Sequence, residues 1–406
     1  MILYTLVLCL LFVYILVKNR KIDLFVLALA SYFLFTFSLL FGVLPGPKSY
    51  PDRVVEDAVY LAFFSLGVAL LVGVVVNDYI SRVFNFRESL SQTDESFVFS
   101  VWCVWLFLLL FLFFRHGSGL LVGMSKRELM DAGGLEIVFF NVISIFVISL
   151  SIIRSRFIGF GGAVVVSFVL VFGHRAPVVI GGIVGVLFRL SLRPKGRLYK
   201  KITLLNVAGV VLGVLLAVMM KPIIATVKSG DVESLQRRYE SSSFELLYAG
   251  AEFMRTQYIF NEIVRTDFST DGGHIVRAPA SLLPIPRSAW TTPSSEFNDL
   301  YQPVIFPDVR GGMAYNLMAE FYAAYGGGGV IIGSTFVAVA ISFFNLMFFC
   351  VTKNHSRVFL LLLGTFWAFY SYRNSLATTF AYMRNFSIIF IVCVSLSLMV
   401  PKKNRG

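Results

Sequence analysis

Arginine side chains recur through one long polar insert, which runs from about residue 221 to residue 329 of an otherwise apolar chain. Arginine stays charged at any relevant pH, and its planar guanidinium donates paired hydrogen bonds to phosphate oxygens. Several such side chains could neutralise the charge that develops on a pyrophosphate leaving group. We predict this role for Arg255, Arg287 and Arg310. The alternative is that arginines of the insert pair with its own carboxylates, which we favour for Arg265.

Three further arginines lie beside apolar runs. Arg175 follows His174 in a short polar break, and Arg373 and Arg384 flank a connection between two late hydrophobic segments. A charge at membrane depth is costly, so an arginine there usually pairs or lines a polar cavity. We predict that these side chains bind the same anionic substrate. The alternative for each is a side chain that reaches the lipid headgroups at the interface.

Carboxylates and histidines are the candidate proton acceptors, because a general base must reach the proton it removes with a suitable pKa. We predict Glu252, Glu320 and His174 as catalytic candidates, and His274 is a rival. Each carboxylate could instead serve in a structural ion pair. The residue types therefore support a transfer reaction without selecting one base.

The composition places these residues in a membrane protein. Hydrophobic residues make up 57% of the chain and charged residues 14%, against about 25% charged in soluble proteins. Repeated apolar runs of about 18 or more residues predict an all-α polytopic membrane protein. The net charge of +12 lies largely in short basic loops, and the insert is more acidic than basic, so we expect no nucleic-acid partner. The four cysteines fall in apolar runs, and we expect no cofactor or metal.

Hydropathy predicts about eleven transmembrane helices. They lie near 1–17, 23–44, 57–76, 97–114, 134–153, 156–173, 176–190, 203–220, 328–351, 357–371 and 383–400. Five basic clusters then share one side, which we take as cytoplasmic, with the C-terminus; the N-terminus and the insert lie outside. This divides the chain into an N-terminal bundle (1–220), a long outer loop (221–327) and C-terminal helices (328–406). The pair around His174 could instead be short helices that dip from one side.

Within the insert, apolar residues at three- and four-residue steps predict a helix over 244–264. The stretch after Asp271 is rich in Pro and Ser and predicts loop. The run Gly326–Gly329 lacks the Lys-Ser/Thr of a phosphate loop. We predict that it is a flexible, close-packed entry to the next helix.

Three segments resemble the Wzy-type O-antigen and oligosaccharide repeat-unit polymerases of bacteria: Leu283–Trp290, Met318–Gly326 and Gly173–Pro177. The order of a helix pair with an outer arginine, a long periplasmic loop and a few closing helices is also similar. The resemblance implies a metal-independent glycosyltransferase of the inner membrane, whose donor and acceptor are both glycans on undecaprenyl pyrophosphate. It also implies a chain-length regulator protein as a possible partner. Arg175 and Arg287, with Arg373 or Arg384, would hold the pyrophosphate, and Glu252, Glu320 or His174 would take the acceptor proton.

Other functions share part of this pattern. An O-antigen ligase has the same architecture and donor but transfers to the lipopolysaccharide core. A lipid-linked glycan flippase or other transporter would carry no chemistry, and many transporters show two related halves, which this sequence lacks. A non-catalytic scaffold would have little need of arginines beside its apolar segments.

Overall fold

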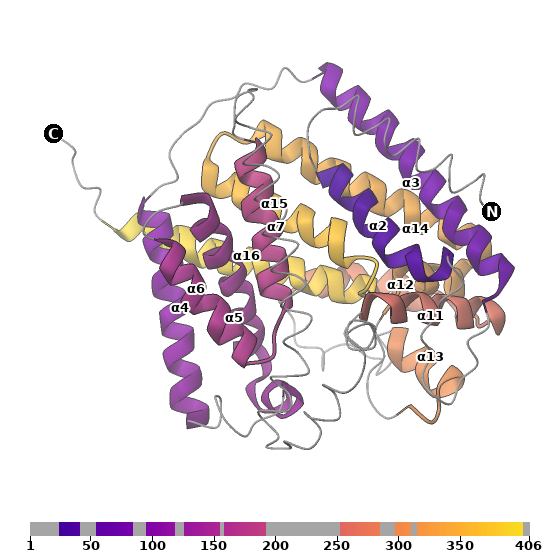
Figure 1. Ribbon diagram of the computed structural model, residues 1–406, viewed down its shortest axis with the longest axis horizontal. Helices are drawn as coiled ribbons and strands as arrows, with labels where there is room; N and C mark the ends of the chain where they lie inside the picture. Colours follow the sequence, from indigo (N-terminus) through magenta and orange to yellow (C-terminus); the bar gives the residue numbers. More distant parts are fainter. Residues whose placement is uncertain are drawn as a thin grey trace, which may run out of the picture. The chain divides into compact units, whose positions relative to one another are not determined.

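A computed structural model describes residues 24–40, 54–83, 95–117, 126–154, 158–191, 252–284, 297–309 and 315–400. All regular structure in these ranges is helical (Figure 1). The helices are α2 (Leu24–Leu40), α3 (Glu56–Val83), α4 (Glu95–His116), α5 (Lys126–Arg154), α6 (Ile158–Val171), α7 (Ala176–Ser191), α11 (Glu252–Arg265), α12 (Gly273–Arg277), the 3-10 helix η2 (Ala278–Leu282), α13 (Phe297–Ile305), α14 (Leu317–Cys350), α15 (Asn354–Tyr370) and α16 (Leu376–Met399).

A helix occupies each predicted span that falls in these ranges, whereas 1–17 and 203–220 lie outside them. Within the described ranges, five helices are long and apolar enough to cross a membrane, over the segments Glu56–Gly73, Glu95–His116, Gly134–Ile153, Leu317–Cys350 and Leu376–Met399. The prediction of an all-helical membrane protein is therefore confirmed at this level. The count of about eleven spans, the sidedness and the long outer loop stay predictions.

The chain forms two compact units, each assembled from separate stretches of sequence. Unit 1 comprises Met1–Arg87, Glu252–Cys350 and Leu363–Arg384; unit 2 comprises Glu88–Ala251, Val351–Leu362 and Asn385–Gly406. The predicted boundaries at 220 and 327 divide the chain by its position in or outside a membrane, whereas these two units are defined by packing. The predicted boundaries stay predictions.

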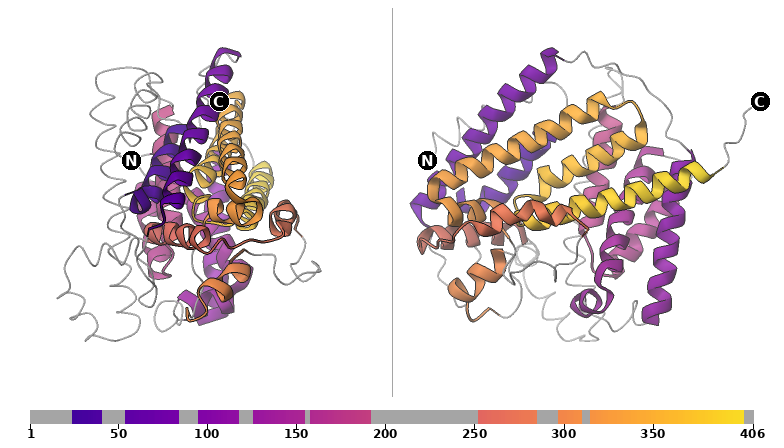
Figure 2. Two further views of the ribbon diagram at one scale, coloured as in Figure 1. Left: turned by 90° about the vertical axis from the view of Figure 1, so that its right-hand side faces the viewer. Right: turned by 180° about the vertical axis from the view of Figure 1, so that it is seen from behind.

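Unit 1 is built on α2, α3 and α14, which pack against one another. Polar side chains join these helices: the Tyr32 hydroxyl donates to the Ala62 carbonyl at 2.7 Å, and the Ser65 and Ser334 hydroxyls lie 2.6 Å apart. Helix α11 packs against all three and runs across one end of them, as Figures 1 and 2 show. The insert is therefore anchored directly on the apolar helices.

Helix α14 begins eleven residues earlier than the predicted span, at Leu317 rather than 328 (328 − 317 = 11). The Asn316 side chain caps it by accepting from the backbone N–H groups of Met318 and Ala319 at 2.9 and 3.2 Å. The helix then breaks at Tyr325 and at Gly326 (φ 61°, ψ −151°), a conformation essentially confined to glycine. Hydropathy missed the first segment because the break separates it from the long apolar run.

The segment before this break, Leu317–Ala324, packs back on the helix that follows it. A Cβ added to Gly329 would lie 1.9 Å from the Phe321 carbonyl oxygen, and one added to Gly333 would lie 2.7 Å from the Phe321 ring. Glycines four residues apart thus form a groove of the small-xxx-small kind, which lets backbones approach closely. The predicted close packing at the run Gly326–Gly329 is confirmed at Gly329, whereas a Cβ at Gly326 or Gly328 would meet nothing within 4 Å.

Helix α16 also begins earlier than predicted, at Leu376 rather than 383. The Ser375 hydroxyl accepts from the Thr378 N–H at 3.1 Å and so caps the helix. The connection between α15 and α16 is therefore a short turn over 371–375, and Arg384 lies within α16 rather than at the end of a connection. Threonines and a tyrosine in the first turns of α16 lower its hydropathy, which explains the error.

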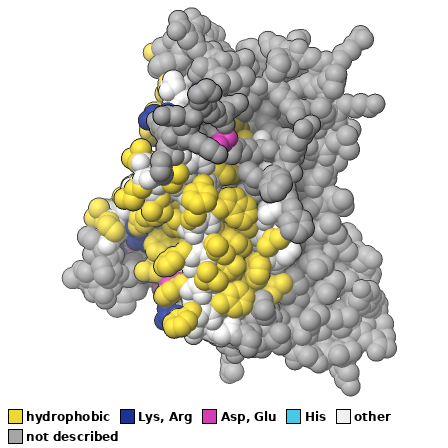
Figure 3. Space-filling view, turned by 90° about the vertical axis from the view of Figure 1, so that its left-hand side faces the viewer, with side chains coloured by type: hydrophobic (Ala, Val, Ile, Leu, Met, Phe, Trp, Pro, Cys, Tyr) yellow, Lys and Arg dark blue, Asp and Glu magenta, His cyan; other side chains and the backbone are white. Residues whose placement is uncertain are grey.

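Unit 2 includes α4–α7, in which α5 packs against α4, α6 and α7. Gly181 and Gly185 of α7 face Ile148 and Ile152 of α5, so small residues again permit a close crossing. Large apolar side chains of α4 remain exposed: Phe99, Leu106, Phe107, Leu110, Phe111 and Phe114. Figure 3 views the side on which α4 lies in Figure 1 and shows a broad hydrophobic surface. Such a surface fits contact with lipid tails.

Candidate functional site

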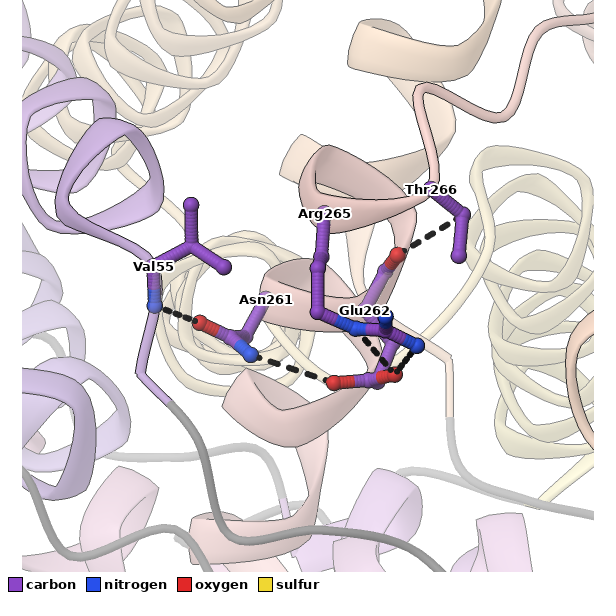
Figure 4. A network of polar contacts seen from close by, with 5 residues as sticks. All are labelled: Val55, Asn261, Glu262, Arg265 and Thr266. Carbon is purple, nitrogen blue, oxygen red and sulfur yellow. Dashed lines mark hydrogen bonds and ion pairs between the residues drawn. The ribbon is translucent and has the colours of Figure 1, made fainter.

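Helix α11 is the central element of the polar contacts in unit 1, and its residues 256–264 are all buried. Glu262 is 0% exposed, and its Oε2 accepts from Nε and Nη2 of Arg265 at 2.9 and 2.7 Å (Figure 4). Asn261 donates to the Glu262 carboxylate at 3.3 Å and accepts from the Val55 N–H at 2.8 Å, beside the start of α3. The hydrogen bonds to Glu262 raise the pKa of Arg265. The prediction that Arg265 pairs with an acid of the insert is confirmed.

The stretch after Asp271, predicted as loop, contains α12, η2 and α13. Helix α13 lies on the side of α11 away from α2 (Figure 1). His274 of α12 is 1% exposed and stacks on Phe297 of α13 at 5.4 Å between ring centroids. Burial lowers the pKa of His274, although the backbone of Glu320 and the Asp271 carboxylate oppose this shift. Aromatic stacking between short helices orders this part of the insert, a tertiary effect that hydropathy does not detect.

The first segment of α14, which is the last part of the insert, bonds to earlier residues of the insert. The Thr270 N–H donates to the Ala323 carbonyl at 2.7 Å, and the Tyr322 hydroxyl donates to Asp267 Oδ1 at 3.3 Å. At its other end, Asn316 Nδ2 donates to the Thr256 carbonyl of α11 at 2.9 Å. The insert and the start of α14 therefore form one hydrogen-bonded layer at the end of unit 1.

Three of the predicted site residues belong to this layer or bond to it. Glu320, which is 1% exposed, accepts through Oε2 from the Leu376 N–H at 2.8 Å. The backbone carbonyl of Arg373 accepts from the Tyr315 N–H at 3.2 Å. The guanidinium of Arg373 lies 5.9 Å from the centroid of the Tyr370 ring. Arg384 Nη1 donates to the Leu283 carbonyl at 3.2 Å. The Arg384 guanidinium is thus held against the insert at Leu283, whereas the bond between Arg373 and the insert runs through the Arg373 backbone carbonyl.

His174 and Arg175 lie in unit 2, in the turn between α6 and α7. The N–H of Gly173 (φ 80°) donates to the Leu170 carbonyl at 2.9 Å, and that of His174 to the Val169 carbonyl at 3.0 Å. This pair of bonds ends α6 in a Schellman motif. His174 is buried and Arg175 half-buried. The predicted polar break is therefore an ordered tight turn; the roles of both residues stay predictions.

The remaining predicted residues lie wholly or partly outside the described residues. Glu252 and Arg255 belong to the first turn of α11, and their side chains lie outside the described residues. Arg287 and Arg310 also lie outside them. Their proposed substrate contacts stay predictions.

Several polar residues that shape this layer were missed. Asn316 and Ser375 each cap a helix, and an Asn or Ser just before a helical run is a recognisable start signal. Asn374 is also buried in the α15–α16 turn, between Arg373 and the cap. Hydropathy windows average over such single residues, so the caps could have been found only from local capping patterns.

Among the described residues, no group of three or more His, Cys, Asp or Glu side chains is arranged to hold a metal ion. No protein-family model, curated protein sequence or solved structure matches this chain.

Proposed function

We propose that the protein is a glycosyltransferase of the bacterial inner membrane that polymerises oligosaccharide repeat units carried on undecaprenyl pyrophosphate. The observation that carries the proposal is the placement of Arg373 and Arg384. Hydrogen bonds link the α15–α16 turn, which carries Arg373, and helix α16, which carries Arg384, to the polar insert at one end of a membrane-type bundle. A lipid-linked pyrophosphate needs this combination of apolar helices for its tail and cations for its headgroup.

In the proposed reaction, a hydroxyl of the acceptor's terminal sugar attacks the anomeric carbon of the donor glycan. The bond from that carbon to the pyrophosphate oxygen breaks, and undecaprenyl pyrophosphate leaves with the bonding electrons. The hydroxyl proton passes to a base on the protein or to water. Arg373 and Arg384 would stabilise the charge on the leaving group, and the proposal assigns no step to a divalent metal.

The test is an assay with purified protein in nanodiscs and defined undecaprenyl-pyrophosphate repeat units, with EDTA present. We expect a ladder of longer glycans on a gel, and we expect Arg373→Ala and Arg384→Ala to weaken it at equal amounts of folded protein. Lys353→Ala is the matched control, because it removes an exposed cation outside this layer.

Other outcomes would contradict the proposal in distinct ways. Transfer only to an added lipid A-core acceptor would indicate an O-antigen ligase. Movement of the lipid-linked substrate across the bilayer without any new glycosidic bond would indicate a flippase.

A further inference from the structure

Glu320 sits in a short segment that is rigidly placed. Asn316 caps the segment, Phe321 fills the groove at Gly329 and Gly333, and Thr270 bonds to its last turn. A side chain on such a segment has a defined direction, so its single charged group can fix another element in space.

The carboxylate of Glu320 is already engaged with the backbone of the neighbouring helix. Oε2 accepts from the Leu376 N–H, and Leu376 is the first residue of α16. The first N–H groups of a helix have no acceptor within the helix, so Glu320 supplies the one that Leu376 lacks. A carboxylate there also interacts favourably with the helix dipole.

The element that this bond holds is the turn that carries Arg373. Residues 315 and 320 each bond to the turn: Tyr315 N–H to the Arg373 carbonyl, and the Glu320 carboxylate to Leu376 N–H. Asn374 and Ser375 lie between the two bonded residues, Arg373 and Leu376. The backbone of the turn is therefore fixed at Arg373 by Tyr315 and, three residues later, at Leu376 by Glu320.

We propose that Glu320 is a positioning residue, which holds the α15–α16 turn and its Arg373 in place, and that it is not the proton acceptor of the reaction. The inference rests on the proposed function where it concerns Arg373, but the contact itself can be tested without activity. It replaces our sequence-based prediction of Glu320 as a catalytic base.

The deciding variants are Glu320→Gln and Glu320→Ala. The amide oxygen of Gln can accept the bond from Leu376 N–H but cannot serve as a base, whereas Ala can do neither. Hydrogen exchange of the peptide over residues 371–378, measured by mass spectrometry on the full chain in nanodiscs, reports the bond directly. We expect exchange at Leu376 to rise about tenfold or more in Glu320→Ala and to stay near wild type in Glu320→Gln. Equal exchange in all three proteins would overturn the contact.

The glycan-ladder assay reports the role. We expect Glu320→Gln to keep most of the wild-type rate and Glu320→Ala to lose much of it. Loss of a general base would instead cost about 10²- to 10⁴-fold in Glu320→Gln, and that result would overturn the proposal.

A double-variant cycle separates positioning from general damage. If Glu320 acts through Arg373, the added effect of Glu320→Ala should be small in an Arg373→Ala background. Fully independent effects would contradict the inference. A wild-type protein that makes no ladder would refute the proposed function, while the exchange experiment would still decide whether Glu320 holds the turn.

Discussion

Two neighbouring glycines of α14 should respond in opposite ways to the same substitution. A Cβ at Gly329 would lie 1.9 Å from the Phe321 carbonyl oxygen, whereas a Cβ at Gly328 meets nothing within 4 Å. Real Cβ contacts stay beyond about 3.0 Å, so Gly329→Ala must displace backbone by at least about 1 Å (3.0 − 1.9 = 1.1). Overpacking typically lowers the free energy of unfolding by about 1–3 kcal/mol. Because backbone yields less readily than a side chain, we expect Gly329→Ala to lose about 3 kcal/mol. Gly328→Ala should gain about 0.5–1 kcal/mol from helix propensity.

The assay is thermal unfolding in detergent, followed through tryptophan fluorescence, since Trp367 lies buried in the same unit. We expect Gly329→Ala to melt at least about 5 °C below Gly328→Ala. Gly333→Ala provides an internal check, because there the obstacle is the Phe321 ring rather than backbone. Its effect should shrink in a Phe321→Ala background, whereas that of Gly329→Ala should persist. Equal melting of the Gly328 and Gly329 variants would refute the packing of Leu317–Ala324 on this groove.

Three further substitutions test the polar contacts of unit 1. Arg265→Leu removes the charge partner of the fully buried Glu262 carboxylate. Because the Arg265 side chain is 39% exposed, we expect the free energy of unfolding to fall by about 2 kcal/mol rather than by the roughly 3–5 kcal/mol of a fully buried pair. Adding Glu262→Gln should restore part of the melting temperature, and no restoration would count against the pair. For His274, burial lowers the folded-state pKa below the ordinary 6.5, so the unfolded chain takes up a proton first. The stability that neutral His274 provides is present above pH 6.5 and is lost as the pH falls towards the folded pKa. The melting temperature should therefore drop more between about pH 7.5 and 5.5 in wild type than in His274→Gln, and parallel curves would contradict this. Ser65→Ala should lower the free energy of unfolding by only about 0.5–1 kcal/mol, because Ser334 keeps its bond to the Val330 carbonyl. A loss of stability several times larger in the same melting assay would contradict this.

The helical segments were largely predictable, while their starts were not. Long apolar runs must form helices in a bilayer, because every backbone polar group there needs an internal partner. The errors at Leu317 and Leu376 arose where a cap or a break, rather than hydropathy, decides the boundary. The short-range signals of Asn316 and Ser375 were present in the sequence, as was the Gly329/Gly333 spacing.

The candidate site shows the same division. Residue types alone indicated arginines and carboxylates suited to a pyrophosphate substrate, and they could not show which of them meet. The fold brings Leu376 to Glu320 and Arg384 to Leu283, across 56 and 101 residues of sequence respectively. It also changes the interpretation of Glu320, whose bond to Leu376 no local pattern reveals.

The sequence by itself determined that this is a helical membrane protein with a polar, arginine-bearing insert. Composition and hydropathy suffice for that conclusion, because transfer into lipid depends on each segment independently. Only the tertiary structure decided that the insert packs on α2, α3 and α14, and that Glu320 bonds to the start of α16. These contacts depend on side-chain direction and on close approach at glycine, which are properties of packed helices rather than of any single segment.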